Sequence, residues 1–236
     1  MVSTRPDLTT VTNLLSKYLF RPSQGHLDYC RHVLRYIKGS KDLGISFSST
    51  HSSSLSAFLH FPIDTSMLAL ADANWSAQDQ SLRRLDALEL PLFKSRSLSG
   101  YIIWFNGPLH WVSKRQKITA RSTAEAEIYA TDECTKNVLH IRLLLEDLDL
   151  LPIFAPDATA IYNDNVACVQ WSKNMTTKGL RHVQLRENAV RESVQAKTVA
   201  VSHVAGDVNL ADLFTKEDKH IQHFLSLRDV IMSTRR

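Results

Sequence analysis

Carboxylates stand at the ends of two short apolar segments of this 236-residue chain. Asp72 closes the run Leu68-Ala-Leu-Ala, and Asp164 follows Tyr162 and Asn163. Because side chains alternate along a strand, each aspartate shares a strand face with larger residues. A single aspartate at a strand end is more commonly a turn former or a helix cap, so neither residue alone predicts chemistry.

Two glutamates, Glu125 and Glu127, begin a segment for which we expect a long helix, from about Thr123 to Leu148. Steps of one or two turns from Glu127 reach an apolar stripe that must face the core: Cys134, Val138, Ile141 and Leu145. The same steps from Glu125 reach a mixed face, for which we expect solvent contact: Asp132, Lys136 and Leu143. A glutamate heading a core-facing stripe is costly without a compensating cation or partner, so Glu127 is the preferred candidate.

A fourth carboxylate, Asp212, follows a β-branched segment and a short turn. On position alone it is a first-turn residue that complements a helix dipole. The set of four carboxylates favours a metal-binding role instead. Acidic residues from two strand ends and two helices repel one another when they converge. Divalent cations would remove that repulsion, and they prefer oxygen ligands.

The elements that must position these residues alternate between helix and strand. We expect two helices within Asp7–Ile37 broken at Arg21-Pro-Ser, a strand at Leu68–Asp72, a hairpin of Tyr101–Phe105 and Leu109–Val112 around Asn106-Gly107, the long helix, a strand at Thr159–Asn163, helices at Val166–Lys173 and His182–Ala196, a strand at Thr198–Val204, and a helix from Leu210. This order predicts a mixed α/β sheet. Small polar residues at 48–57 predict a linker and a boundary near 50–60.

Composition narrows the class of protein. The hydrophobic content of 44% suffices for a core, and the net charge of +4 suits a polyanion partner without requiring one. Three widely spaced cysteines, Cys30, Cys134 and Cys168, indicate neither a disulfide framework nor a zinc site. Charges interrupt every long apolar stretch, so we expect an intracellular protein with no membrane partner.

These motifs resemble, in order and spacing, the ribonuclease H domain of copia-type long-terminal-repeat retrotransposon polyproteins. The matching segments are Ala71-Asp-Ala-Asn-Trp75, Ser97-Leu-Ser-Gly-Tyr101, Trp111–Gln116 with Arg121–Glu127, Tyr162-Asn-Asp-Asn165, Arg181-His182 with Arg191-Glu192, and Leu210-Ala-Asp-Leu-Phe-Thr-Lys216. Three departures are Asn74 for a second aspartate, Glu217 for the usual proline, and a longer segment at 77–96. None of the departures removes one of the four carboxylates.

The N-terminal part resembles the region just downstream of the reverse-transcriptase palm in the same family, through Thr4-Arg-Pro-Asp7 and His32–Gly39. No Tyr-Val-Asp-Asp polymerase motif is present, so we do not expect this chain to polymerise DNA. The resemblance therefore implies a helical thumb or connection remnant at 1–47, a Ser-rich linker at 48–60 and a ribonuclease H-like domain at 61–236.

The resemblance further implies a mixed five-stranded sheet flanked by helices, with a short N-terminal helical appendage. It implies that Asp72, Glu127, Asp164 and Asp212 hold two Mg²⁺ ions, with Mn²⁺ as a substitute, and that the substrate is the RNA strand of an RNA–DNA hybrid. Glu127 is preferred here too, because Ala126-Glu-Ile-Tyr-Ala130 matches the family's Ala-Glu-x-x-Ala pattern. The implied partner is the reverse-transcriptase domain of the same polyprotein, in the cytoplasm, the nucleus or virus-like particles.

Several residues keep two interpretations. Four cations before the long helix fit either phosphate contacts or a solvated turn: Lys114, Arg115, Lys117 and Arg121. The position of His203 on a predicted strand, before a short turn, favours a structural role. His182 belongs to a motif but has no assigned chemistry. The alternative function is a non-catalytic remnant of a decayed or domesticated element that binds a hybrid or a protein partner. Asn74, Glu217 and the absent polymerase motif favour it, and the four retained carboxylates oppose it. A third interpretation is a structural connection domain inside a larger reverse transcriptase.

Overall fold

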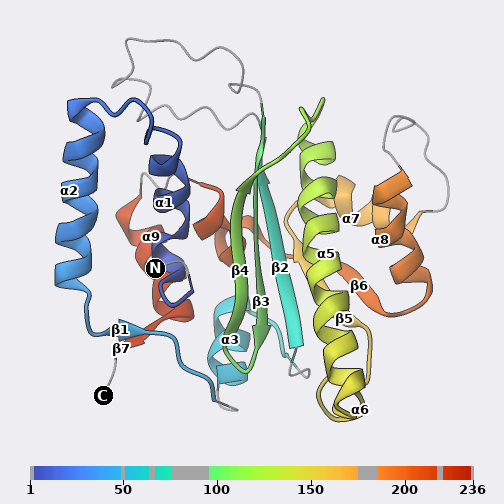
Figure 1. Cartoon of the computed structure of the whole chain (residues 1–236). Coiled ribbons are helices and arrows are strands. Elements are labelled where there is room, and N and C mark those ends of the chain that lie inside the picture. Colours follow the sequence, from blue (N-terminus) through green and yellow to red (C-terminus); the bar gives the residue numbers. More distant parts are fainter. Residues whose placement is uncertain are drawn as a thin grey trace.

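The computed structural model describes residues 3–48, 51–63, 67–75, 96–174, 185–216 and 220–234 (Figure 1). Its strands are β1 Leu43–Gly44, β2 Met67–Asn74, β3 Leu98–Phe105, β4 Pro108–Arg115, β5 Thr159–Asn163, β6 Val199–His203 and β7 Ser233–Thr234. Its α-helices are α1 Thr9–Ser16, α2 Gln24–Gly39, α3 His51–Leu59, α5 Thr123–Asp147, α6 Leu151–Phe154, α7 Val166–Lys173, α8 Leu185–Gln195 and α9 Ile221–Ile231. Short 3₁₀ turns are η1 Pro6–Leu8, η3 Gly206–Val208 and η4 Leu210–Phe214.

Five strands form the central sheet in the order β4-β3-β2-β5-β6. The pairs β4–β3 and β3–β2 are antiparallel, whereas β2–β5 and β5–β6 are parallel. The tight turn at Asn106-Gly107 joins β3 to β4, with both residues at positive φ. The predicted mixed five-stranded α/β sheet is therefore confirmed.

Helices cover both faces of this sheet (Figure 1). On one face α5 packs on Met67, Ala69 and Ala71 of β2 through Cys134 and Val138. On the other face a second core joins the strands to α3, η4 and α9, with these members among others: Leu55, Leu59, Leu68, Leu70, Leu210, Phe214 and Leu227. The alternating residues of β2 thus supply both cores, which fixes the strand between the two helical layers.

The segment predicted as a Ser-rich linker contains a helix, so the prediction for 48–60 is wrong over α3. Leu55 and Leu59 of this helix are 1% and 3% exposed and belong to the core beneath α9. Two leucines one turn apart bury enough apolar surface to order serine-rich sequence around them.

The N-terminal appendage also joins the main core. Leu8 and Leu14 are buried, Thr10 donates a 2.7 Å hydrogen bond to the Leu213 carbonyl, and β1 pairs with the C-terminal β7. By contrast α2 lies at the periphery (Figure 1), and His26 is its one fully buried residue. The helix expected from Leu210 is divided into η4 and α9.

Candidate active site

Parallel pairing of β2 with β5 brings two aspartates together. Leu70 lies opposite Tyr162 in this register, and each strand reaches its aspartate two residues later, at Asp72 and Asp164. Glu127, in the second turn of α5, completes the group: one carboxylate oxygen from each of the three lies within 4.8 Å of the others. Such an all-oxygen set fits a hard divalent cation such as Mg²⁺.

Burial makes these carboxylates costly to ionise. Asp72 is 1% exposed and Glu127 is 5% exposed, whereas Asp164 is partly exposed. Burial, followed by the charge of Asp212, raises the pKa of Asp72 to about 7. Burial, followed by the charge of Asp72, raises the pKa of Glu127 to about 9. A bound cation would favour the ionised form of both groups.

Asp212 lies beside this group but contacts a cation of the chain itself. It is buried in η4, and Lys216 places its Nζ 2.6 Å from Asp212 Oδ1 and 3.8 Å from Asp72 Oδ1. Burial lowers the pKa of Lys216, but the charges of Asp72 and Asp212 outweigh it and leave the pKa raised. His223 Nε2 of α9 lies 3.7 Å from the other oxygen of Asp212. Asp212, the fourth predicted residue, thus lies at the edge of the site. The Lys216 ammonium group lies between Asp212 and Asp72 and pairs with both.

Glycine allows η4 to approach the sheet closely. Gly100 of β3 pairs with Asp72, and a Cβ at Gly100 would lie 2.6 Å from Thr215 Cγ2 and 2.7 Å from Phe214 Cβ. The Thr215 hydroxyl donates to Asp72 Oδ2 across this gap. The glycine in the Ser97–Tyr101 motif therefore brings Asp212 and Thr215 to the β2 carboxylate.

Glu125 does not face solvent as we expected, and this prediction is wrong. It is 6% exposed, its backbone N–H donates to the N-cap Ser122 Oγ at 3.1 Å, and its Oε2 accepts from the Arg121 N–H at 2.6 Å. Asp132 on the same face is also buried and pairs with Lys136 at 2.7 Å. Glu125 therefore stabilises the helix start and lies outside the three-carboxylate group.

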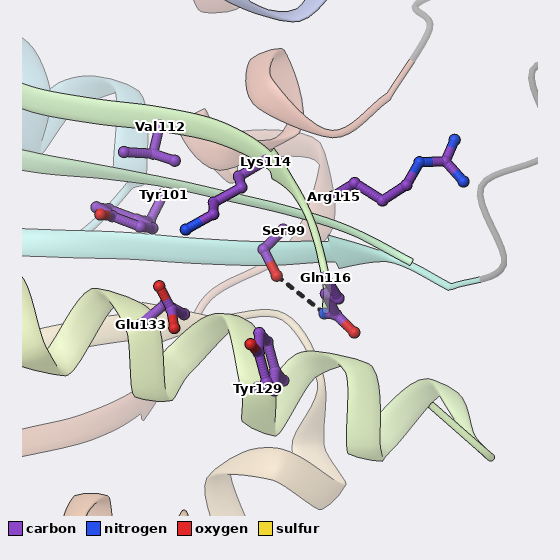
Figure 2. Close-up of a pocket in the computed structure, with 8 residues that line it drawn as sticks. All are labelled: Ser99, Tyr101, Val112, Lys114, Arg115, Gln116, Tyr129 and Glu133. Atoms are coloured by element: carbon purple, nitrogen blue, oxygen red, sulfur yellow. Dashed lines mark hydrogen bonds between the residues drawn. The ribbon is translucent and has the colours of Figure 1, made fainter. Parts of the chain in front are cut away.

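The four predicted phosphate-contacting cations lie along β4 and the loop before α5. Lys114, Lys117 and Arg121 are exposed, whereas Arg115 is partly buried with Nη1 3.4 Å from the Arg96 carbonyl. Figure 2 shows a small pocket here, with Lys114 and Tyr101 on its strand side and Tyr129 and Glu133 on its α5 side. The arrangement gives an exposed basic strip that leads to the start of the helix bearing Glu127.

The two histidines differ in what the structure describes. His203 ends β6 and lies with Nε2 3.2 Å from the Asp164 backbone carbonyl, next to the site but not among its carboxylates. His182, Glu217 and most of the segment 77–96 lie outside the described residues.

Three residues of the site escaped the sequence analysis: Asn163, Thr215 and Lys216. All three lie inside motifs named above: Asn163 comes one residue before Asp164, and Thr215 and Lys216 follow Asp212 by three and four residues. That spacing was a usable signal for Lys216, because residues four apart face each other on a helical turn. The contacts of Asn163 and Thr215 arise between distant segments and have no local signal.

Comparison with known proteins agrees with the sequence motifs. Over 90% of its length the chain is 30% identical to the retrovirus-related Pol polyprotein from transposon RE2 of Arabidopsis thaliana, of which the match covers 13%. Over 92% it is 26% identical to the corresponding polyprotein from transposon TNT 1-94 of Nicotiana tabacum, of which the match covers 14%. The chain thus spans about one seventh of the length of these curated relatives. No family model matches the sequence.

Among solved structures, LC11-RNase H1, isolated from compost by a metagenomic approach, is similar with a TM-score of 0.43 and 11% identity. The match covers 65% of this chain and 94% of that one. Both of the curated relatives named above are retrotransposon Pol polyproteins. They are of the copia type, which confirms the predicted relationship to this family. The relationship is consistent with the ribonuclease H motifs of this chain. Within the described residues no helix is both long and apolar enough to cross a membrane.

Proposed function

We propose that this chain is a ribonuclease H that hydrolyses the RNA strand of RNA–DNA hybrids with two Mg²⁺ ions. The observation that carries the proposal is the group formed by Asp72, Glu127 and Asp164, whose ligand atoms lie within 4.8 Å of one another. Three buried or half-buried carboxylates from three separate elements repel one another, and a divalent cation offsets that repulsion. The copia-type relatives favour a role during reverse transcription, with the reverse-transcriptase domain as partner.

Each residue has a distinct task in this proposal. Asp72 is the candidate for a ligand shared by both ions, because it belongs to the three-carboxylate group and also faces Asp212 across Lys216. Asp212 would supply a further carboxylate ligand for the second ion. The chemistry that bound Mg²⁺ supplies at such a site is activation of water and stabilisation of the leaving oxygen. Lys216 balances Asp72 and Asp212 by charge before a cation is bound.

In this proposal, basic residues outside the carboxylate group bind the substrate. The exposed Lys114, Lys117 and Arg121 can contact phosphates without reading sequence. Selective cleavage of RNA requires a contact with the 2′-hydroxyl, the group that distinguishes RNA from DNA at a given position.

The test is cleavage of an end-labelled RNA–DNA hybrid, with duplex DNA and duplex RNA of the same sequence as controls. We expect cleavage of the hybrid RNA strand with Mg²⁺ or Mn²⁺, none with Ca²⁺, and none by Asp72→Asn. The larger Ca²⁺ coordinates loosely and should bind without supporting in-line geometry. Robust turnover in Ca²⁺ would contradict the two-metal proposal. Binding of the hybrid without cleavage in Mg²⁺ and Mn²⁺ would favour the non-catalytic alternative.

A further inference from the structure

Asn163 lies directly behind the three-carboxylate group. It is the last residue of β5 and is 0% exposed. Its Nδ2 donates to Glu127 Oε2 at 3.0 Å and to the Ala71 carbonyl of β2 at 3.2 Å. Its Oδ1 accepts the Asn165 N–H at 2.8 Å. One side chain therefore connects the strands that carry Asp72 and Asp164 with the glutamate of α5.

These contacts fix the direction of the amide. Because the Asn165 N–H occupies Oδ1 and the Ala71 carbonyl accepts from Nδ2, the side chain cannot flip without losing both hydrogen bonds. The NH₂ group must then face Glu127. An amide donor partly compensates a buried carboxylate while adding no charge, so it does not neutralise the negative charge that ionised Glu127 would offer a cation.

We propose that Asn163 is a positioning residue for the divalent-cation site: it binds Glu127 Oε2 and thereby holds the glutamate in the geometry that a cation shared with Asp72 and Asp164 requires. This inference rests on the proposed function, since it takes Glu127 as a cation ligand. Partners that orient a ligand in this way commonly change metal affinity by about 10–100-fold when they are removed.

Another buried amide provides a matched control. Gln116 is 2% exposed, and its Nε2 donates to Ser99 Oγ and to the Ala126 carbonyl of α5, both at 2.9 Å. Figure 2 shows the Ser99 contact on the strand side of α5. Gln116 thus anchors the same helix within one residue of Glu127, but among the described residues its hydrogen bonds go to Ser99 and Ala126 and not to a carboxylate. Loss of either amide removes a buried side-chain donor to a backbone carbonyl.

The experiment measures Mn²⁺ binding to the full chain without nucleic acid, by electron paramagnetic resonance titration. The variants are Asn163→Leu, Asn163→Thr and Gln116→Leu, each also melted in EDTA. Leucine has the same branching and the same number of side-chain heavy atoms as asparagine, although its methyl groups are bulkier, and it makes no hydrogen bond. Threonine suits a strand end and keeps a hydroxyl, but that hydroxyl is one bond too short to reach Glu127, so this variant serves if the leucine variant does not fold.

We expect both Asn163 variants to bind Mn²⁺ about 10–100-fold more weakly and to change the spectrum of the bound ion. Gln116→Leu should lose comparable stability yet bind Mn²⁺ within about threefold of wild type, because it leaves the carboxylates in place. Unchanged affinity in the Asn163 variants, or an equal loss in Gln116→Leu, would overturn the positioning role alone. No Mn²⁺ binding by the wild-type chain would overturn the proposed function, and this inference with it.

Discussion

Asp72 and Glu127 differ from ordinary surface carboxylates in what surrounds them. Both are nearly inaccessible to water, and each lies within reach of a further carboxylate. Glu125, two residues away from Glu127, is equally buried but accepts a backbone N–H from Arg121 at the start of α5. In the proposed function, these two glutamates therefore have different tasks: Glu127 is a cation ligand, and Glu125 stabilises the helix terminus.

Substitution of the two glutamates separates these tasks. Glu127→Gln should lower hybrid cleavage roughly 100-fold or more, because it removes a charged ligand from the three-carboxylate group. Glu125→Gln should leave cleavage within about threefold of wild type and cost about 0.3–1 kcal/mol of stability, the usual effect of a charge at a helix start. Cleavage rates and melting curves of both variants check this. Loss of activity in Glu125→Gln with retention in Glu127→Gln would mean that the other glutamate serves the site.

At the scale of elements, the close approach of η4 to β3 determines where Asp212 lies. Gly100 leaves room for Thr215 and Phe214 against the strand, and the Thr215 hydroxyl then reaches Asp72. Asn209 begins η4 by accepting the Ala211 N–H at 3.1 Å, and its Nδ2 donates to the Ala71 carbonyl. The 3₁₀ turn is thus attached to β2 at both of its ends.

Gly100→Ala should push η4 away from the sheet. The new Cβ would lie under 3.0 Å from Thr215 Cγ2 and Phe214 Cβ, and overpacking of this kind costs about 1–3 kcal/mol. We expect cleavage to fall about tenfold or more, because Asp212 moves with η4. Gly39→Ala is the control: nothing lies within 4 Å of its added Cβ, so stability should stay equal or rise by about 0.5–1 kcal/mol. Equal melting temperatures for both variants would refute the packing argument.

At the scale of the whole molecule, the buried carboxylates link folding to pH. The folded protein raises the pKa of Asp72 from 3.8 to about 7 and that of Glu127 from 4.5 to about 9. The folded state therefore binds more protons than the unfolded state between about pH 4 and pH 9, and stability falls as pH rises through this range. A cation that binds only the folded state acts in the opposite direction.

We expect the melting temperature in EDTA to decrease steadily from pH 5 to pH 9 and the increase caused by Mg²⁺ to grow over the same range. Glu127→Gln should flatten the upper part of the EDTA profile, because glutamine does not titrate. Calorimetric scans at four or five pH values check this. A metal-free profile that rises toward pH 9 would contradict the pKa shifts.

The N-terminal helices, whose sequence resembles the same family, also pack on the rest of the described fold. Removal of residues 1–47 takes Leu8 and Leu14 out of the core, where burial of two leucines stabilises a fold by about 3–6 kcal/mol. We expect the melting temperature to fall by roughly 10 °C or more. Leu19→Ser in the full chain should change it little, because Leu19 is 80% exposed. An unchanged melting temperature after truncation would mean that residues 1–47 form a separate unit.

The sequence by itself determined most of the succession of elements and placed Glu127 on the face of α5 that packs on the sheet. Strands β2, β5 and β6, the β3–β4 hairpin and helices α5 and α7 lie where periodicity and turn residues predicted them. These signals are local, because a strand or helix repeats its pattern within a few residues. The sequence also showed that a motif contains Gly100, but it did not show that Thr215 and Phe214 pack against this glycine.

The tertiary structure alone decided which groups meet. The parallel β2–β5 register places Asp72 beside Asp164, α3 forms because Leu55 and Leu59 find a core, and Glu125 is buried although its face is polar. Lys216 contacts Asp72 across 144 residues of sequence separation and Asn163 contacts Glu127 across 36. Such contacts depend on packing between distant segments, and no periodicity within one segment encodes the partner it will meet.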